Sequence, residues 1–216
     1  MHSIFLKLFK YAISSFSMLD FNNIATKWQK KWEIDKVFQA KTDKRKKFYV
    51  AIVYPYMSGL LHLGHLFTYT ASEVMLRYKR MNNFNTLAKY GFHCTGTPIV
   101  AAAKKVAENE PNQISALKKM NISESEIPKF ADPEYWCEYF PKETLKDAKA
   151  MGLAIDEQYA FKTTHLDPAY DKFITWQFNK LKQKGYVKKG KHPVVWCPKD
   201  NLPVGDHDRS EGEGET

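Results

Sequence analysis

The sequence predicts an α/β fold built on a parallel sheet. Two apolar, strand-like runs at residues 48–53 and 84–88 flank a long helical pattern at 63–81. Strands joined through a helix of this length run parallel, because a tight hairpin cannot make the connection. A Gly/Pro-containing turn at 54–62 separates the first strand from the helix, and two asparagines at 82–83 end the helix. We therefore expect a strand–helix–strand unit with a right-handed crossover.

A helical pattern precedes the first strand. It spans residues 20–40, and a charged linker at 41–47 follows it. Its apolar positions are Ile24, Trp28, Trp32 and Phe38. This spacing is typical of one helix with a single apolar side.

More helices are expected after the second strand. Residues 104–131 are rich in Lys and Glu and predict short surface helices. Longer helices begin at Asp132-Pro133 and Asp167-Pro168, where Asp caps the helix and Pro fits its first turn. They end near Met151 and Gly185, and we expect their aromatic residues to lie in the core. Two further strands are expected at 186–189 and 193–197.

The turn before the long helix carries the most informative residues. His62 and His65 stand three apart around Gly64, which places both rings on one side of the opening turn. A helix N-terminus also offers unpaired N–H groups and a positive dipole end, both suited to phosphate. Gly64 lacks the side chain that would hold a nucleotide off the backbone. The pattern indicates a nucleotide site, with a plain helix cap as the alternative.

A family resemblance supports the nucleotide site. Residues 55–65, PYMSGLLHLGH, resemble the HIGH signature of class I aminoacyl-tRNA synthetases, in the form of archaeal and eukaryotic-cytosolic leucyl-tRNA synthetases. Further matches follow in order at 67–70, 77–81, 91–99, 176–178 and 206–209. An ordered series of separate matches is far more specific than one tetrapeptide.

The resemblance implies a domain organisation. Residues 18–190 would form the amino-terminal half of a Rossmann-like catalytic domain with helical insertions. Residues 191–216 would begin an inserted editing domain that is truncated here. The resemblance starts at about Met18, so we interpret residues 1–17 as a non-native or disordered extension. Ligands of open α/β sheets bind at the carboxyl ends of the strands, so the loops 55–65 and 91–99 are expected to face one pocket.

The resemblance also implies a reaction. The carboxylate of leucine would attack the α-phosphate of ATP, which enters with Mg²⁺, and the leucyl group would then pass to tRNA(Leu). His62 and His65 would be the catalytic residues, donating hydrogen bonds to ATP. Further implied site residues are Pro55 and Gly64 for ATP, and Tyr56, Ser58 and His93 for the amino acid and the adenylate. His93 stands where the bacterial branch has an acidic residue, and a structural role for it is equally open.

Part of the family pattern is absent from the printed sequence. The lysine signature written KMSKS does not occur in it. We therefore predict that this chain alone is inactive and needs a complementary carboxyl-terminal portion. The alternatives are a synthetase for isoleucine, valine or methionine, a small nucleotidyltransferase with an HxGH site, or a non-catalytic half of a split synthetase.

Composition indicates the partners and the cellular compartment of the protein. Lys and Arg total 33 against 24 Asp and Glu, a formal net charge of +9, which suits a polyanionic partner such as tRNA. Three scattered cysteines indicate a reducing compartment, and no apolar run reaches membrane-spanning length, so a cytoplasmic protein with no membrane partner is expected. The residues considered for zinc are His192, Cys197, Asp200 and His207. We predict no structural zinc, because Asp200 breaks the C-x-x-C spacing that such sites prefer.

Overall fold

The computed structural model describes residues 19–198 and 201–203. The chain divides into two compact units, Met1–Val37 and Phe38–Thr216. The predictions for residues 1–17 and for the matches at 206–209 lie outside the described residues. The predicted boundaries at 18–190 and 191–216 stay predictions.

The described part of the first unit is one helix. Helix α2 (Phe21–Ile34) begins at Asp20, whose carboxylate accepts the N–H of Asn23 at 3.0 Å. The prediction of one helix over 20–40 is wrong in its length. Lys36 has φ of 52°, a left-handed backbone that cannot continue a helix, so Phe38 does not lie on α2.

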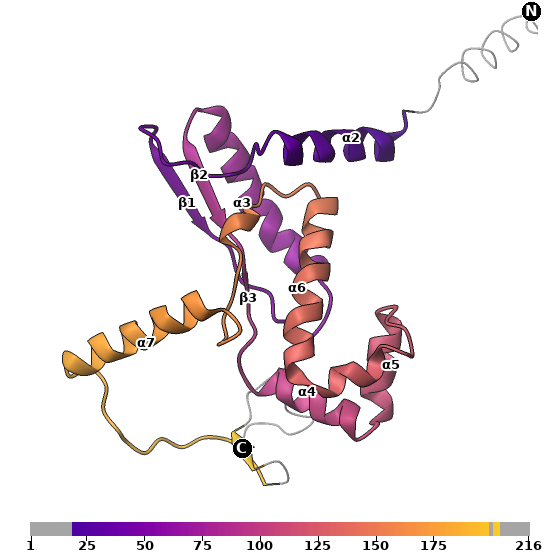
Figure 1. Ribbon diagram of the computed structural model, residues 1–216, viewed down its shortest axis with the longest axis vertical. Helices are drawn as coiled ribbons and strands as arrows, with labels where there is room; N and C mark the ends of the chain where they lie inside the picture. Colours follow the sequence, from indigo (N-terminus) through magenta and orange to yellow (C-terminus); the bar gives the residue numbers. More distant parts are fainter. Residues whose placement is uncertain (1–18, 199–200, 204–216) are drawn as a thin grey trace, which may run out of the picture. The chain divides into compact units, whose positions relative to one another are not determined.

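The second unit contains the predicted strand–helix–strand motif. Strand β1 (Lys47–Ala51) leads through the turn to α3 (Leu63–Met81) and then β2 (Asn85–Lys89). The two strands pair in parallel, with Phe48 opposite Thr86, and α3 packs on both (Figure 1). The bounds of α3 are those expected from the sequence, and each strand lies one residue from its expected start. The asparagine break is confirmed, since Asn83 has φ of 62°.

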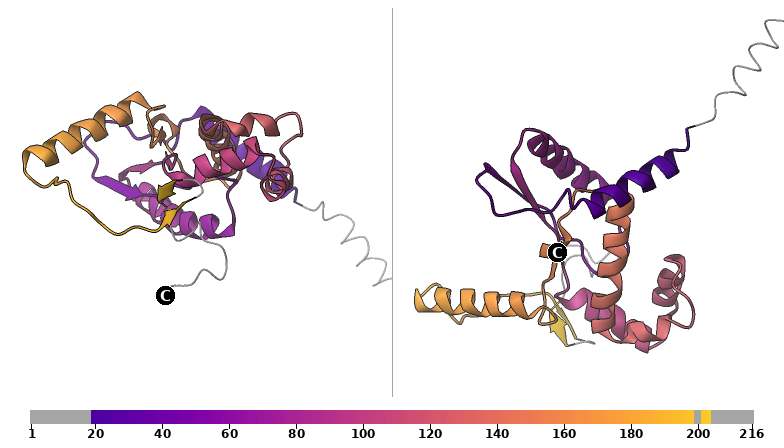
Figure 2. Two further views of the ribbon diagram at one scale, coloured as in Figure 1. Left: turned by 90° about the horizontal axis from the view of Figure 1, so that it is seen from below. Right: turned by 45° about the horizontal axis from the view of Figure 1, so that its top comes forward.

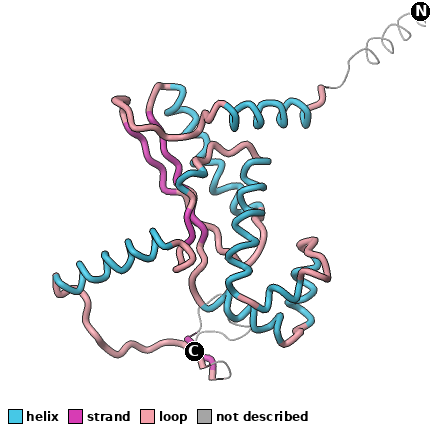
Figure 3. Tube along the Cα trace, viewed as in Figure 1, coloured by secondary structure: helices cyan, strands magenta, loops and turns pink. Residues whose placement is uncertain are grey.

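A second parallel pairing was not predicted. Strand β3 (Gly91–Phe92) follows β2 after Tyr90 and pairs with β4 (Phe161–Lys162). Gly91 permits this approach, because a Cβ there would lie 2.8 Å from the ring of Tyr54 and 2.9 Å from that of Phe161. Hydrogen bonding among the described residues gives three two-stranded sheets (Figure 3), so a continuous Rossmann-like sheet stays a prediction.

Helices make up most of the remaining second unit. They are α4 (Thr97–Ala107), α5 (Pro111–Lys119), the 3₁₀ turn η1 (Ile127–Ala131), α6 (Pro133–Ala150), the 3₁₀ turn η2 (Glu157–Tyr159) and α7 (Pro168–Gln183). The first four lie together, with α4 against both η1 and α6 (Figure 2). The short helices expected over 104–131 are confirmed, but their expected surface position is wrong, since Val106, Leu117 and Phe130 are buried in the core. However, α4 already starts at Thr97 inside the expected loop, where Pro98 fits the first helical turn.

The two Asp-Pro helix starts are confirmed. The Asp132 carboxylate accepts the N–H of Glu134 at 2.9 Å, and that of Asp167 accepts the N–H of Ala169 at 3.1 Å. The strand expected at 186–189 is wrong, since that segment has no strand pairing. Only β5 (Trp196–Cys197) forms from the strand expected at 193–197, paired antiparallel with β6 (Leu202–Pro203).

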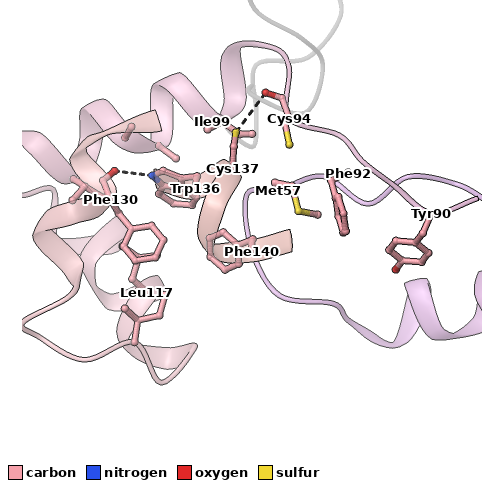
Figure 4. Close-up of a cluster of buried hydrophobic side chains, with 14 of the residues drawn as sticks. Met57, Tyr90, Phe92, Cys94, Ile99, Leu117, Phe130, Trp136, Cys137 and Phe140 are labelled. Carbon is pink, nitrogen blue, oxygen red and sulfur yellow. Dashed lines mark hydrogen bonds between the residues drawn. The ribbon is translucent and has the colours of Figure 1, made fainter. Parts of the chain in front are cut away.

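The core is centred on α6. Trp136, Phe130 and Phe140 are fully buried, and the indole Nε1 of Trp136 donates to the carbonyl of Phe130 at 2.6 Å (Figure 4). The prediction that aromatic residues of α6 form core is therefore confirmed. The same prediction is wrong for α7, which has no buried residue. No described segment covers the apolar side of α7.

Candidate functional site

His62 and His65 cap the start of α3 reciprocally. His62 is the N-cap residue, and its Nδ1 accepts the N–H of Gly64 at 3.1 Å. The N–H of His62 donates in return to Nδ1 of His65 at 3.2 Å. The two ring centroids lie 3.9 Å apart. The helix cap is therefore present and both rings lie on one side of the turn, as expected, while the nucleotide site stays a prediction.

Gly64 has a contact that the sequence did not predict. A Cβ at this position would lie 2.9 Å from Cε1 and 3.1 Å from Nδ1 of His62. Contacts this short force a neighbour to move, so glycine is needed for the His62 ring to reach its capping position. The close approach of a nucleotide to Gly64, which the sequence analysis expects, stays a prediction.

The two loops that were expected to face one pocket lie side by side. The N–H of His93 donates to the carbonyl of Pro55 at 2.9 Å, and the N–H of Met57 donates to the carbonyl of His93 at 3.0 Å. Between these bonds Tyr56 and His93 form a parallel bridge, with their rings stacked at 4.3 Å. The Tyr56 hydroxyl also donates to the carbonyl of Thr95. A pocket between the loops stays a prediction.

Pro55, predicted for ATP, and the three residues predicted for the amino acid and the adenylate occupy different settings. Pro55 is buried, whereas Tyr56, Ser58 and His93 are half-buried. Nδ1 of His93 is buried and has no hydrogen-bond partner among the described residues. A buried nitrogen without a partner costs free energy, so it is a position where a ligand or water atom is expected.

The far side of the 91–99 loop is also anchored. The N–H of Cys94 donates to Oγ1 of Thr163, just after β4, at 3.0 Å. Contact with the Cys137 thiol, followed by burial, raises the pKa of the Cys94 thiol. A raised pKa keeps the thiol protonated at neutral pH, and Cys94 packs in the core cluster.

An aromatic row connects the two parts of the site. The ring of His65 lies 6.0 Å from Tyr69, Tyr69 lies 5.7 Å from Tyr90, and Tyr90 lies 5.6 Å from Phe92. Phe92 directly precedes His93. The sequence analysis missed Tyr69 and Tyr90, although Tyr69 stands four residues after His65 and therefore on the same side of α3.

Burial affects the protonation state of the histidine turn. Burial lowers the pKa of His65 below its usual range, and the neighbouring His62 adds to this shift. Burial also raises the pKa of the Tyr69 phenol. His65 is therefore neutral at pH 7, as its acceptor role in the cap requires.

The described residues offer no metal cluster. No three His, Cys, Asp or Glu side chains gather within 19–198 and 201–203. Of the residues considered for zinc, Asp200 and His207 lie outside this part of the chain, so the prediction of no structural zinc stays a prediction. In the same part of the chain, no helix has the length and apolar character needed to cross a membrane.

Comparison with known families decides the membership of the chain. Residues 27–213 match the family described as tRNA synthetases class I (I, L, M and V). The chain belongs to this family. The resemblance first seen in the HIGH-like turn is thereby confirmed.

Similar proteins of this family are leucine–tRNA ligases. The chain is 46% identical over 187 residues to that of Aeropyrum pernix, which covers 86% of this chain and 20% of the relative. It is 44% identical over 200 residues to that of Methanocaldococcus jannaschii, covering 92% and 21%. The chain thus spans about one fifth of the length of these relatives.

A solved structure shares the fold. The agnB2 LeuRS of Agrobacterium radiobacter K84, determined as a ternary complex with tRNA and LeuAMS, matches with a TM-score of 0.62 and 22% identity. The match covers 82% of this chain and 19% of that one. The mixed helix and strand fold of the chain is therefore that of a class I synthetase catalytic domain.

Proposed function

We propose that this chain forms the amino-terminal portion of a leucine–tRNA ligase. The complete enzyme would join leucine to the α-phosphate of ATP, release pyrophosphate, and transfer the leucyl group to tRNA(Leu). The observation that carries the proposal is the reciprocal histidine cap at the start of α3, in a chain of this family. The identity of 42–48% to leucine–tRNA ligases supports leucine as the amino acid.

The histidine turn would bind the phosphates of ATP. Because Nδ1 of His62 and of His65 accepts a backbone N–H, Nε2 of each ring would contact the phosphate oxygens, and the dipole of α3 favours negative charge at the same place. Charge on these oxygens grows in the transition state. Donors fixed in advance stabilise that charge without reorganising, which is the main way a protein accelerates such a transfer.

The paired loops would hold the amino acid and the adenylate. Tyr56 and His93 stack on each other at the end of the parallel pairing, and Ser58 lies in the same turn. The unpartnered Nδ1 of His93 supports a ligand contact at this point. We propose that His93 contacts the bound amino acid or adenylate, in place of the acidic residue of the bacterial branch.

Mg²⁺ would arrive on ATP and not on a protein site. The donors at the start of α3 are N–H groups, which suit phosphate oxygens and cannot ligate a cation. The described residues gather no cluster of acidic or other metal ligands. Mg²⁺ is therefore proposed as part of the ATP substrate.

The apolar surface of the second unit supports a complementary portion of protein. One side of α3 forms an outer stripe made of Leu63, Phe67, Val74, Tyr78 and Met81. Leu63 and Phe67 are each 82% exposed, and Tyr49 and Val53 are exposed on one face of β1 and the residues after it. Apolar patches of this extent mark interfaces. We propose that a carboxyl-terminal portion, carrying the lysine signature, covers the outer stripe and supplies the rest of the phosphate contacts.

The remaining parts of the proposal follow from the family. The net charge of +9 supports tRNA(Leu) as a partner. The Rossmann-like half-sheet, the start of an editing domain after residue 190 and a cytoplasmic location are proposed with it. A ligase for isoleucine, valine or methionine is the alternative, because the family includes these enzymes.

An amino-acid panel tests the proposed function. The chain would be joined to the carboxyl-terminal portion of an archaeal relative and assayed for ATP–pyrophosphate exchange with leucine, isoleucine, valine and methionine. We expect leucine to be preferred. Isoleucine and valine should retain some activity, because one methylene is worth only about 1–3 kcal/mol in an apolar pocket. A preference for any of the other three amino acids would contradict the assignment to leucine.

A further inference from the structure

We infer that the reciprocal cap fixes the tautomers of both histidines, and that Gly64 is the positioning residue that makes this possible. In this arrangement both rings carry their proton on Nε2 and present it away from the backbone. The consequence for catalysis rests on the proposed function. The tautomers themselves follow from the hydrogen bonds of the turn.

The backbone selects the tautomer of each ring. Nδ1 of His62 accepts the N–H of Gly64, and Nδ1 of His65 accepts the N–H of His62. A nitrogen that accepts cannot carry a proton, so a neutral ring in this position holds its proton on Nε2. The opposite tautomer, or a doubly protonated ring, would set two N–H groups against each other and break the cap.

The result is a pair of outward donors. With the ring centroids 3.9 Å apart, the two Nε2–H groups lie on neighbouring rings over one turn of helix. Ser, Thr, Asp and Asn are the preferred N-cap residues, and histidine is not among them. Those residues would cap α3 equally well, but they would not place a ring N–H beyond the cap. The use of histidine at both cap positions therefore indicates that the Nε2–H group of each ring has a function of its own.

Gly64 makes room for the first ring. Any Cβ at this position would meet Cε1 of His62 at 2.9 Å and Nδ1 at 3.1 Å. Because the backbone of α3 holds residue 64, the His62 ring would have to shift, which would disturb the 3.1 Å hydrogen bond that it accepts from the N–H of Gly64. Substitution of Gly64 should thus allow His62 to adopt both tautomers, while the other elements of the second unit stay intact.

Nitrogen NMR of the 216-residue chain tests the inference without any ligand. Chemical shifts of ¹⁵N-labelled histidine distinguish a protonated ring nitrogen from an accepting one. The signals of His62 and His65 would be assigned with the variants His62→Asn and His65→Gln. We expect both rings to be wholly in the Nε2–H form in the folded chain, and to become tautomer mixtures when urea unfolds it. A mixture at either ring in the folded chain would overturn the inference.

A glycine variant and a matched control sharpen the test. In Gly64→Ala we expect His62 to lose its single-tautomer signal, whereas Gly190→Ala should change nothing, since nothing lies within 4 Å of a Cβ there. An unchanged His62 signal in folded Gly64→Ala would overturn the role of Gly64. If that variant does not fold, the signals of the unsubstituted chain still show whether each ring has a single tautomer. Failure of the proposed function would appear separately, as fixed tautomers in a chain whose reconstituted enzyme does not catalyse pyrophosphate exchange.

Discussion

The region around α6 and the region around the start of α3 differ in how completely they are packed. Trp136, Phe130 and Phe140 are fully buried in a core cluster that also contains Ile99 of α4 and Leu117 of α5. The outer stripe of α3 is apolar but exposed, and Met81 at its end is 86% exposed. A buried core stabilises the fold where it stands, whereas an exposed apolar surface gains free energy only from a partner. The stability of the second unit is thus concentrated around α6, and its candidate site lies beside the exposed apolar stripe of α3.

The largest effect is expected from opening the packed region. Trp136→Ala removes a fully buried ring and its hydrogen bond to Phe130, which should cost about 3–5 kcal/mol of unfolding free energy. That is a large part of the stability of a small domain. Urea unfolding of the 216-residue chain measures the loss.

Trp176→Ala on α7 is the matched control for that variant. Trp176 is 55% exposed, so its removal should change the unfolding free energy by about 0.5 kcal/mol or less. Equal losses in the two variants would mean that burial around α6 does not stabilise the fold in the way described.

A smaller but specific effect is expected at the histidine turn. His62→Asn keeps a good N-cap residue and removes the ring, so it separates capping from chemistry. In the reconstituted enzyme, leucine-dependent pyrophosphate exchange should fall by about 2–4 kcal/mol of transition-state stabilisation, in His62→Asn as in His62→Ala. Urea unfolding should show that only His62→Ala also weakens the start of α3. Full exchange activity in His62→Asn would mean that His62 only caps the helix and takes no part in the reaction.

The open surface should affect association and not stability. Phe67→Ser in the outer stripe should leave the unfolding free energy of the isolated chain nearly unchanged, because Phe67 is 82% exposed. Its binding to the carboxyl-terminal portion should weaken by about 1–2 kcal/mol or more, as for an aromatic residue in an interface core. Titration calorimetry measures this affinity. Val100→Ser, an exposed apolar residue on α4, is the control, and an equal loss there would contradict a specific role for the stripe.

The smallest effect concerns pH. Burial and the nearby His62 lower the pKa of His65 in the folded chain. A lowered folded pKa stabilises the fold above the unfolded pKa of about 6.5, and this stabilisation is lost as pH falls through the folded value. Unfolding free energy should therefore decrease as pH falls below about 6.5. His65→Gln keeps the standard capping-box residue and cannot titrate, so its pH dependence should be weaker over the same range. An equally steep dependence in both proteins would assign the effect to another group.

Local signals in the sequence were sufficient for the strand–helix–strand unit and the histidine turn. The helix at 63–81 was predictable because its apolar spacing and its two ends agree, and Asp132 and Asp167 marked their helices through capping chemistry. The pairing of β3 with β4 was not predictable, because it joins Phe92 to residues about 70 positions away through strands of two residues.

The errors have physical causes that single residues illustrate. Lys36 ended α2 by adopting a left-handed backbone, which no propensity of lysine predicts. The apolar side of α7 resembles a core helix in sequence, yet its burial depends on whatever packs against it. At the site, the conflict between a Cβ at residue 64 and the His62 ring depends on a rotamer, and the row from His65 to Phe92 depends on tertiary packing.

Leucine-dependent ATP–pyrophosphate exchange by the purified 216-residue chain, alone and mixed with a carboxyl-terminal portion that carries the lysine signature, tests the central claim most directly. The claim is that the start of α3 is one side of an adenylation site whose other side lies elsewhere. We expect negligible exchange by the chain alone, because one-sided contacts leave the remaining phosphate oxygens to water. Mixing with the complementary portion should produce exchange, and His62→Asn should reduce it. Robust leucine-dependent exchange by the chain alone would contradict the account.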